Sequence, residues 1–402
     1  MNDIVVIGAS LAALRAVEAL RSDGYDGSIT VIGAEPGLPY DRPPLSKQVL
    51  AGSWAPERAA LDPIGATYDD LDVDWRLGQQ ATGLDLAART VSLADGSAAR
   101  YDGLVIATGA GVRTLPGQPD LVGLHTLRTL DDCLALKADF DAHPSRVVVV
   151  GAGFIGAEVA ATARGLGLDV TVLEALPVAL QRGLGDVMGA VCGDIHRDHG
   201  VELRLSAGVA GFVADGSGRV SRVRLLDGSS IETEVVLVGV GVAPATGWLE
   251  GSGLTIEDGV MCDETCLAAP GVVAAGDVAR WPNRRFGEVM RLEHWDNAQE
   301  QGAHAARRLL AGDSLPAGTG AYEPVPWFWS DQYDRKIQVA GRTGSDAQVV
   351  VVEGSTDERR FVALYGRGKR LVGVLGMNRP AAVMRWRQAI VDGMAWDEAL
   401  AL

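Results

Sequence analysis

The sequence predicts an α/β fold with two parallel sheets and a smaller α+β region at the C-terminal end. The main observation is a pattern that occurs twice, in residues 4–35 and 147–174: a β-branched strand, a turn of small residues, an Ala-rich helix, a Gly break, a second strand and a terminal Glu. Such βαβ units form parallel sheets with a right-handed crossover. The length of 402 residues suits two or three domains.

The second unit contains a complete G-x-G-x-x-G motif made by Gly151, Gly153 and Gly156. These glycines allow a sharp turn, close approach of the backbone to a pyrophosphate, and tight packing of helix on strand. The free N–H groups and positive dipole end of the helix then face the phosphates. Glu174, at the end of the second strand, is placed to bind a ribose diol. The motif therefore predicts a dinucleotide site.

The first unit departs from this motif, because Ser10 and Ala13 stand where the second unit has glycines. Gly8 still permits the turn, and Ser10 offers a backbone N–H and a hydroxyl to a phosphate. Glu35 ends the second strand and again suits a ribose. One glycine motif is weak evidence, since small residues also tighten ordinary turns. Two whole units, each with its acidic end, predict two dinucleotide sites.

Later segments return to these two sheets. A buried strand at 104–110 precedes the second unit, a similar one at 235–244 follows it, and 271–280 ends another strand with Gly-Asp. This order indicates one nucleotide domain inserted into another. Residues after 320 change in composition, with alternating runs at 348–353 and 361–366 and a helical end. The predicted limits are 1–112 with 245–320, then 113–244, then a C-terminal α+β domain at 321–402.

Composition narrows the class of protein. Apolar residues make up 47% and charged residues 22%, as in globular domains, and the formal charge of -16 disfavours nucleic acid and anionic lipid as partners. No uncharged apolar run approaches the length of a membrane helix, and the sequence starts directly in a strand without a signal-peptide pattern. Four cysteines are too few for a disulfide scaffold. We therefore expect a cytoplasmic protein.

Seven segments together resemble one family. They are GASLAALRAVEALR, YDRPPLSK (40–47), IATGA, VVVVGAGFIGAEVA, GVVAAGDV, EHWDNAQEQG (293–302) and PWFWSDQ (326–332). In this order, over nearly the whole chain, they resemble the FAD-dependent ferredoxin reductases of the oxygenase-coupled type, which include putidaredoxin reductase and the biphenyl-dioxygenase reductases and have a glutathione-reductase-like fold. YDRPPLSK and EHWDNA are more specific than the glycine motifs.

The resemblance implies a set of cofactor contacts in each nucleotide domain. Those for FAD are Gly8, Ser10, Leu11, Ala12 and Arg42 at the pyrophosphate, Glu35 at the ribose, Lys47 at the flavin, Ala107, Thr108 and Gly109 along the FAD, Asp277 at the ribityl chain, and Trp295 and Trp329 beside the isoalloxazine. The helix after Asp277 is expected to face the flavin. Those for the nicotinamide nucleotide are Gly151, Gly153, Phe154, Ile155, Gly156, Glu158, Glu174 and Gly241.

Simpler interpretations of single residues stay open at this point. Lys47 could be a surface lysine, and Glu158 could only complement the helix dipole from the first turn. The two tryptophans could be ordinary core residues. Cys262 and Cys266 are spaced C-x₃-C rather than C-x-x-C, and the stretch 36–50 has no Cys, so a redox cysteine pair is disfavoured and both thiols are expected to be packing residues. The histidines show no metal-ligand spacing.

The activity implied by the resemblance is NADH-dependent ferredoxin reduction. A hydride would pass from NADH to FAD, followed by two one-electron transfers to a [2Fe–2S] ferredoxin that serves a cytochrome P450 or a Rieske dioxygenase. Lys47 and Glu158 would lie at the contact of flavin and nicotinamide, each from a different domain. A rubredoxin reductase and a redox-sensing flavoprotein similar to apoptosis-inducing factor are the alternatives.

Two further expectations concern coenzyme and partner. Glu174 would repel a 2′-phosphate, and no Lys or Arg occurs in 175–181 to neutralise one, so NADH is expected over NADPH. Residues 321–402 hold 11 Lys and Arg against 10 Asp and Glu, so the C-terminal segment is basic relative to the rest of the chain. An acidic ferredoxin is expected to dock there. The candidate contacts are Arg284, Arg285, Arg291, Arg335, Lys336, Arg379, Arg385 and Arg387.

Overall fold

The computed structural model describes residues 1–312 and 320–402. Within these residues the chain divides into two compact units. The first unit contains residues 1–41, 60–111 and 243–324, and the second contains residues 42–59, 112–242 and 325–402. The chain passes between the units after residues 41, 59, 111, 242 and 324, and two of these points lie inside the short strands β8 (Ala110–Val112) and β17 (Val242–Pro244).

A six-stranded sheet forms the centre of the first unit. Its order is β19-β20-β7-β1-β2-β3, and all neighbours are parallel except the β19–β20 pair. The strands β1, β2, β7 and β20 are runs of Val, Ile, Leu and Ala that are almost wholly buried, as expected for a parallel sheet covered on both faces. The strand bounds are β1 (Asp3–Ile7), β2 (Ser28–Gly33), β3 (Asp74–Leu77), β7 (Gly103–Ile106), β19 (Leu267–Ala269) and β20 (Val272–Ala274).

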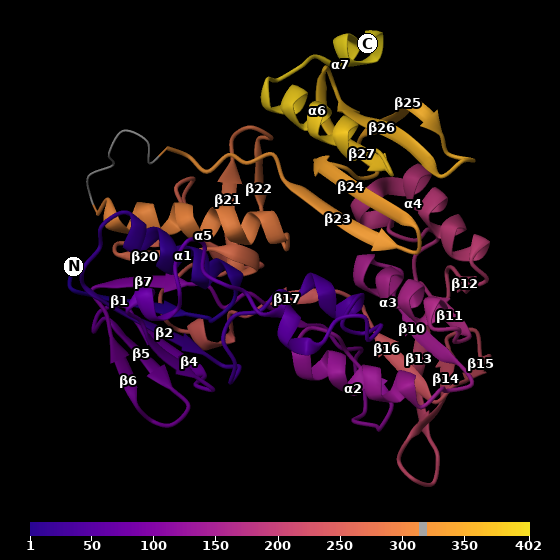
Figure 1. Cartoon of the computed structure of the whole chain (residues 1–402), viewed down its shortest axis with the longest axis horizontal. Coiled ribbons are helices and arrows are strands. Elements are labelled where there is room, and N and C mark those ends of the chain that lie inside the picture. The colour runs from indigo at the N-terminus through magenta and orange to yellow at the C-terminus, as the bar shows by residue number, and fades with distance from the viewer. Residues whose placement is uncertain (313–319) are drawn as a thin grey trace. The chain divides into compact units, whose positions relative to one another are not determined.

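Two helices, α1 (Leu11–Ser22) and α5 (Trp295–Leu310), pack against each other beside this sheet (Figure 1). They approach closely, because a Cβ on Gly302 of α5 would lie 2.3 Å from the carbonyl oxygen of Ala12. Two small sheets complete the unit. One contains β4 (Ala81–Asp85), β5 (Thr90–Leu93) and β6 (Ala98–Arg100), and the other contains β18 (Val260–Met261), β21 (Ala279–Asn283) and β22 (Glu288–Met290).

The second unit contains a parallel sheet in the order β12-β11-β10-β16-β9. Its central strand is the buried VVVV run. The bounds are β9 (Leu124–His125), β10 (Val147–Val150), β11 (Val170–Leu173), β12 (Glu202–Arg204) and β16 (Val235–Val238), with helices α2 (Leu130–Asp141), α3 (Phe154–Gly165) and α4 (Gln181–Asp198). An antiparallel sheet is inserted before β16, formed by β13 (Val209–Ala214), β14 (Val220–Leu225) and β15 (Ser230–Glu232).

The same unit includes the C-terminal region. A five-stranded antiparallel sheet in the order β23-β24-β27-β26-β25 is followed by helices α6 and α7, which confirms the small α+β region expected from sequence (Figure 1). The bounds are β23 (Trp327–Gln332), β24 (Arg335–Gly341), β25 (Gln348–Ser355), β26 (Arg360–Arg367), β27 (Arg370–Met377), α6 (Pro380–Val391) and α7 (Trp396–Ala401).

The C-terminal sheet is attached to helix α4 of the nucleotide-binding part. Helix α4 is kinked at Gly185, whose φ is +73°. Thr343 and Tyr365 donate hydrogen bonds through their hydroxyls to the carbonyl oxygens of Gly183 and Leu184 beside the kink. These contacts join the C-terminal region to the second βαβ unit in one compact unit.

Residues 42–59 also belong to the second unit. They contain the short 3₁₀ helix η1 (Pro43–Ser46), which contacts helices α2 and α3. In the described part of the chain, no helix is both long enough and apolar enough to cross a membrane.

Candidate functional site

The first glycine turn joins β1 to α1. Gly8 has φ +112°, and a Cβ there would lie 2.1 Å from the carbonyl oxygen of Ala107, so the turn requires glycine. Ser10 is the N-cap residue of α1, but its hydroxyl caps no N–H of its own helix. Leu11 and Ala12 follow as the first helical residues. The N–H groups of this turn have the arrangement that a pyrophosphate requires.

Around this turn, the strand ends bring further predicted residues into the first unit. Glu35 follows β2 and accepts a hydrogen bond from the hydroxyl of Tyr40. Asp41 accepts a hydrogen bond from Nε1 of Trp295 at 2.8 Å, so the YDRPP segment and the EHW segment meet. Trp295 is half-buried and begins helix α5. Neither Glu35 nor Trp295 is a solitary surface or core residue.

The predicted strand ends 107–109 and 276–277 lie in the same unit. Thr108 Oγ1 donates to the carbonyl oxygen of Ala245 at 2.9 Å, and Gly109 has φ +67°. Asp277 lies in a 3₁₀ turn directly after β20. The first α-helix after Asp277 is α5, which begins at Trp295 after the β21–β22 hairpin. The alternating apolar pattern of 278–283 favours a strand over a helix.

The second glycine turn has the same geometry as the first. Gly151 has φ +102°, and a Cβ there would lie 2.4 Å from the carbonyl oxygen of Gly239. A Cβ on Gly156 would lie 2.1 Å from the carbonyl oxygen of Gly151. Gly153 is different, because it is the N-cap residue of α3 and a Cβ there would meet nothing within 4 Å. Gly151 and Gly156 are thus required by the fold, whereas the space at Gly153 is free for a ligand.

Three more residues predicted at the nicotinamide nucleotide surround this turn. Glu174, after β11, accepts backbone hydrogen bonds from Ala152 at 2.7 Å through Oε2 and from Leu176 at 2.9 Å through Oε1. The carboxylate is therefore fixed beside the glycine turn. Ile155 is 47% exposed, and Gly241 has φ +100° with open space around its Cα.

A buried ion pair lies beside helix α3. Lys47 Nζ contacts Glu158 Oε2 at 2.9 Å, and the two side chains are only 11% and 4% exposed. Lys47 is therefore not a surface lysine. Glu158 is the fifth residue of α3, so it does not lie in the first turn, where a dipole-complementing carboxylate belongs. The two residues form this pair within the second unit.

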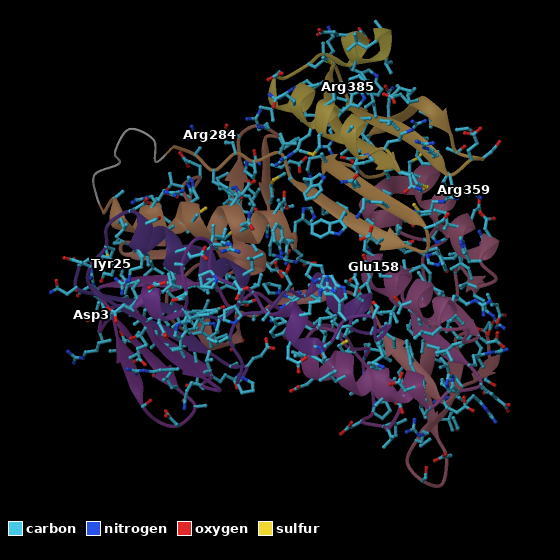
Figure 2. The ribbon with its side chains drawn as sticks, in the orientation of Figure 1. Asp3, Tyr25, Glu158, Arg284, Arg359 and Arg385 are labelled. Carbon is cyan, nitrogen blue, oxygen red and sulfur yellow. The ribbon has the colours of Figure 1, made fainter. Side chains whose placement is uncertain are left out.

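Sequence reasoning missed two serines that complete this site. Ser46 donates to Oε2 of Glu158, and Ser330 donates to Oε1 at 2.7 Å. Figure 2 labels Glu158 beside β23, the strand that carries Ser330. The same strand carries Phe328, which packs edge-on against Phe154 of α3, with ring centroids 4.8 Å apart. Trp329 is half-buried and stacks on Trp327, with centroids 5.2 Å apart.

Arg42, the remaining predicted residue, belongs to the second unit and donates to the carbonyl oxygen of Arg128 at 2.6 Å. Many of the basic residues expected at a docking face are paired with carboxylates: Arg284 with Glu264, Arg291 with Asp258 and Glu293, Arg335 with Asp334, Lys336 with Asp331, and Arg385 with Glu353. These basic residues are divided between the two units.

The four cysteines all lie in the described residues and are buried free thiols. Burial raises the pKa of Cys133 to about 11 and those of Cys192 and Cys262 to about 12, and it also raises that of Cys266. A thiol with a raised pKa is a poor nucleophile. Among the described residues, no group of three or more His, Cys, Asp and Glu could hold a metal ion.

Two glycine turns with helix N-termini, each followed by a carboxylate, define a protein that binds two dinucleotides. The buried Lys47–Glu158 pair lies beside the helix that follows the second turn.

Comparison with known proteins agrees with this class. Residues 2–302 match the family of pyridine nucleotide-disulphide oxidoreductases, and residues 327–402 match the reductase C-terminal family. The chain is 40% identical to rhodocoxin reductase of Rhodococcus erythropolis over 394 residues, covering 97% of this chain and 90% of the relative. It is 37% identical to the ferredoxin–NAD(+) reductase component of the anthranilate 1,2-dioxygenase system of Burkholderia cepacia, covering 98% and 96%.

Among solved structures, the covalent putidaredoxin reductase–putidaredoxin complex matches with a TM-score of 0.91 and 31% identity, covering 98% of this chain and 93% of that chain. The chain therefore belongs to the pyridine nucleotide-disulphide oxidoreductase family. It is an oxidoreductase that uses FAD and NAD(H), and the fold class expected from sequence is confirmed.

Proposed function

We propose that this chain is the NADH-dependent ferredoxin reductase of an oxygenase system, whose oxygenase is a cytochrome P450 or a Rieske dioxygenase. The observation that carries the proposal is the buried Lys47–Glu158 pair next to a dinucleotide turn, in a chain that matches ferredoxin reductases over almost its whole length. Relatives are named as ferredoxin–NAD(+) reductase components, which favours ferredoxin reduction over rubredoxin reduction or redox sensing.

The first unit supplies the FAD cradle. Gly8 opens the turn, and the N–H groups of the α1 N-terminus would hold the pyrophosphate. Glu35 would hold the ribose and Asp277 the ribityl chain. The other proposed contacts in this unit are Ser10, Leu11, Ala12, Ala107, Thr108, Gly109 and Trp295, and those in the second unit are Arg42, Lys47 and Trp329. The domain limits expected from sequence likewise stay a proposal.

The nicotinamide nucleotide would bind at the second turn, through Gly151, Gly153, Phe154, Ile155, Gly156, Glu174 and Gly241. Glu174 is oriented by two backbone N–H groups and would accept bonds from the ribose hydroxyls. Arg204 follows on the neighbouring strand, but its guanidinium is paired with Glu202 at 2.6 Å. A 2′-phosphate would therefore face the Glu174 carboxylate, which favours NADH.

Bound FAD supplies hydride acceptance and single-electron release, so no side-chain nucleophile is needed. Lys47 would place a positive charge where negative charge develops on reduction. Glu158 would orient the nicotinamide carboxamide and balance the charge of Lys47. The acceptor would be an acidic [2Fe–2S] ferredoxin that docks on the basic residues of the C-terminal region.

The test is reconstitution. The purified protein, loaded with FAD, is mixed with NADH, cytochrome c and each of several [2Fe–2S] ferredoxins or a rubredoxin. We expect cytochrome c reduction that depends on a ferredoxin, with NADH preferred to NADPH. Reduction by rubredoxin only, or none with any acceptor, would contradict the proposal. A cytoplasmic location belongs to the same proposal, and the four unpaired thiols support it.

A further inference from the structure

Glu158 has more hydrogen-bond donors than a residue that only balances Lys47 would need. Oε2 accepts from Lys47 and Ser46, whereas Oε1 accepts from Ser330 alone among the described residues. Ser330 is 0% exposed and comes from the C-terminal sheet, 172 residues away in sequence. The carboxylate is thus held at both oxygens, and the hydroxyl at Oε1 comes from a different part of the fold than the donors at Oε2.

A second side chain fixes the direction of the Ser330 hydroxyl. Gln332, also 0% exposed, donates from Nε2 to Ser330 Oγ at 3.1 Å. Because Oγ already accepts this bond, its single hydrogen is directed to Glu158. The other end of the amide, Oε1, forms no hydrogen bond of ordinary geometry within the described part of the chain. The amide orientation therefore depends on what faces Oε1.

His196 of helix α4 lies near Gln332. Burial lowers the pKa of His196 to about 4, and the side chain of Gln332 acts in the opposite direction. The ring is therefore neutral near pH 7. Its Nδ1 and the hydroxyl of Tyr333 form a hydrogen bond at 2.9 Å.

The regular spacing of residues on β23 and α3 places Phe328 and Ser330 against α3. Phe328, Ser330 and Gln332 alternate along β23 and share one face, with about 6.8 Å between successive members. Phe154 and Glu158 are one turn apart on α3, about 6 Å. The two spacings match, so Phe328 meets Phe154 while Ser330 meets Glu158. Gln332 consequently donates to Ser330, and Ser330 donates to Glu158.

We propose that Ser330, held by Gln332, is a positioning residue for hydride transfer. It fixes Oε1 of Glu158, so that the carboxylate keeps one orientation towards the nicotinamide while Lys47 contacts the flavin. This inference rests on the proposed function, since it gives Glu158 its role there. If Ser330 and Gln332 only attached the C-terminal sheet to α3, replacing them would lower the stability and leave the rate of hydride transfer unchanged.

The experiment measures flavin reduction by NADH in single turnovers, with the FAD-loaded protein and no ferredoxin. Ser330→Ala should lower the limiting rate about tenfold, because small misplacements of an orienting group are costly, while the Kd for NADH changes less than threefold. Ser330→Thr keeps a hydroxyl and should recover most of the rate. Ser221→Ala is the matched control, since it removes a half-buried hydroxyl from β14 in the same unit and should match the wild type.

A double-mutant cycle with Glu158→Gln separates positioning from general damage. In the Glu158→Gln background, Ser330→Ala should lower the rate by less than twofold. Thermal unfolding of the same four proteins, followed by circular dichroism, should show the same non-additivity in Tm, which is a measure independent of turnover. Gln332→Leu removes the hydrogen bond that directs the hydroxyl of Ser330 and should lower the rate of flavin reduction about threefold. If Ser330→Ala does not fold, Gln332→Leu and Ser330→Thr together test the positioning role of Ser330.

The inference is overturned if Ser330→Ala behaves like Ser221→Ala, if its loss persists undiminished beside Glu158→Gln, or if the whole effect appears in the Kd for NADH. Failure of the wild-type protein to accept electrons from NADH would instead contradict the proposed function, and the inference with it.

Discussion

Helices α1 and α3 follow the two glycine turns, yet their surroundings differ. The turns share positive φ angles at Gly8 and Gly151 and the same close approach to a neighbouring strand end. Helix α1 is then covered by α5, and its buried charge, Arg15, pairs within the helix with Glu18. Helix α3 instead carries Glu158, whose hydrogen-bond donors come from η1 and β23.

This difference shows what each turn is used for. The first unit pairs its buried charge, the fifth residue of the helix, within that same helix, so the charge serves packing. The second unit has Glu158 at the equivalent position and binds it with side chains from η1 and β23. Binding of the nucleotide and positioning for chemistry are therefore separable by mutation.

The largest effects are expected at the glycines that the turns require. Gly8→Ala places a Cβ 2.1 Å from a carbonyl oxygen at φ +112°, so the turn must distort. We expect the purified variant to lose most of its flavin, measured by the ratio of flavin to protein absorbance.

Gly151→Ala should likewise lower Tm strongly, by about 10 °C or more, because its Cβ has no room either. Gly153→Ala is the informative partner, since its Cβ meets no protein atom. It should fold normally and bind NADH at least tenfold more weakly. Normal NADH binding by Gly153→Ala would show that no ligand approaches this glycine.

Next come the two ion pairs, one beside each turn. Lys47→Met leaves Glu158 buried with two neutral donors, and breaking a buried pair this way costs about 3–5 kcal/mol. The rate of flavin reduction by NADH should fall about a hundredfold. Arg15→Met removes the corresponding charge beside α1 and should lower Tm but leave that rate within twofold. Equal losses of rate in both variants would remove the distinction between the two helices.

Coenzyme preference depends on the carboxylate after β11. Glu174→Arg replaces the acceptor for two ribose hydroxyls with a phosphate-binding group. We expect kcat/KM for NADH to fall about tenfold or more and that for NADPH to rise. Glu35→Arg in the first unit should reduce the FAD content and leave the ratio of kcat/KM for NADH to kcat/KM for NADPH unchanged.

The buried His196 of the second unit should make the stability of the protein depend on pH. The folded pKa of His196 is about 4, below the ordinary value near 6.5, so the unfolded chain binds the proton more readily. Stability is therefore complete above about pH 6.5 and declines by up to about 3 kcal/mol as the pH falls to 4. In His196→Asn, Tm measured between pH 7 and 5 should decline less than in the wild type.

The smallest effects are expected on the surface. The backbone N–H of Lys336 donates to Oδ1 of Asn378, and the backbone N–H of Asn378 donates to the carbonyl oxygen of Lys336. These bonds bring the basic residues Arg335, Lys336 and Arg379 to one end of the C-terminal sheet. Replacing Lys336 and Arg379 with Glu should raise the KM for ferredoxin about threefold and flatten its salt dependence. Flavin reduction by NADH should stay unchanged. A KM indifferent to both salt and charge would assign docking to apolar contacts.

The sequence predicts those features of the fold that depend on residues close together in the chain. Gly8, Gly151 and Glu174 follow from a strand, a turn and a helix read in succession, and the parallel sheets follow from repeated apolar runs. Ser46 and Ser330 have no such signal, because a hydroxyl in PPLS or WFWS can face solvent, backbone or carboxylate. Their role depends on contacts 112 and 172 residues apart in sequence.

The grouping of residues 42–59 was also beyond local reasoning. This segment follows the first βαβ unit in sequence, yet Thr162 Oγ1 of α3 donates to the carbonyl oxygen of Ser46, and Cys133 of α2 donates to that of Leu45. Side chains that lie far along the chain hold it in the second unit.

The attachment of the C-terminal sheet to the α4 kink has a consequence for exchanging parts between relatives. Thr343 and Tyr365 bind carbonyl oxygens that are exposed only because α4 bends at Gly185, and a Cβ at Gly185 would lie 3.0 Å from the backbone of Gly344. A chimera that replaces the coenzyme-binding insert 112–242 must therefore bring its own residues 42–59 and 325–402. The complementary graft consists of residues 1–41, 60–111 and 243–324.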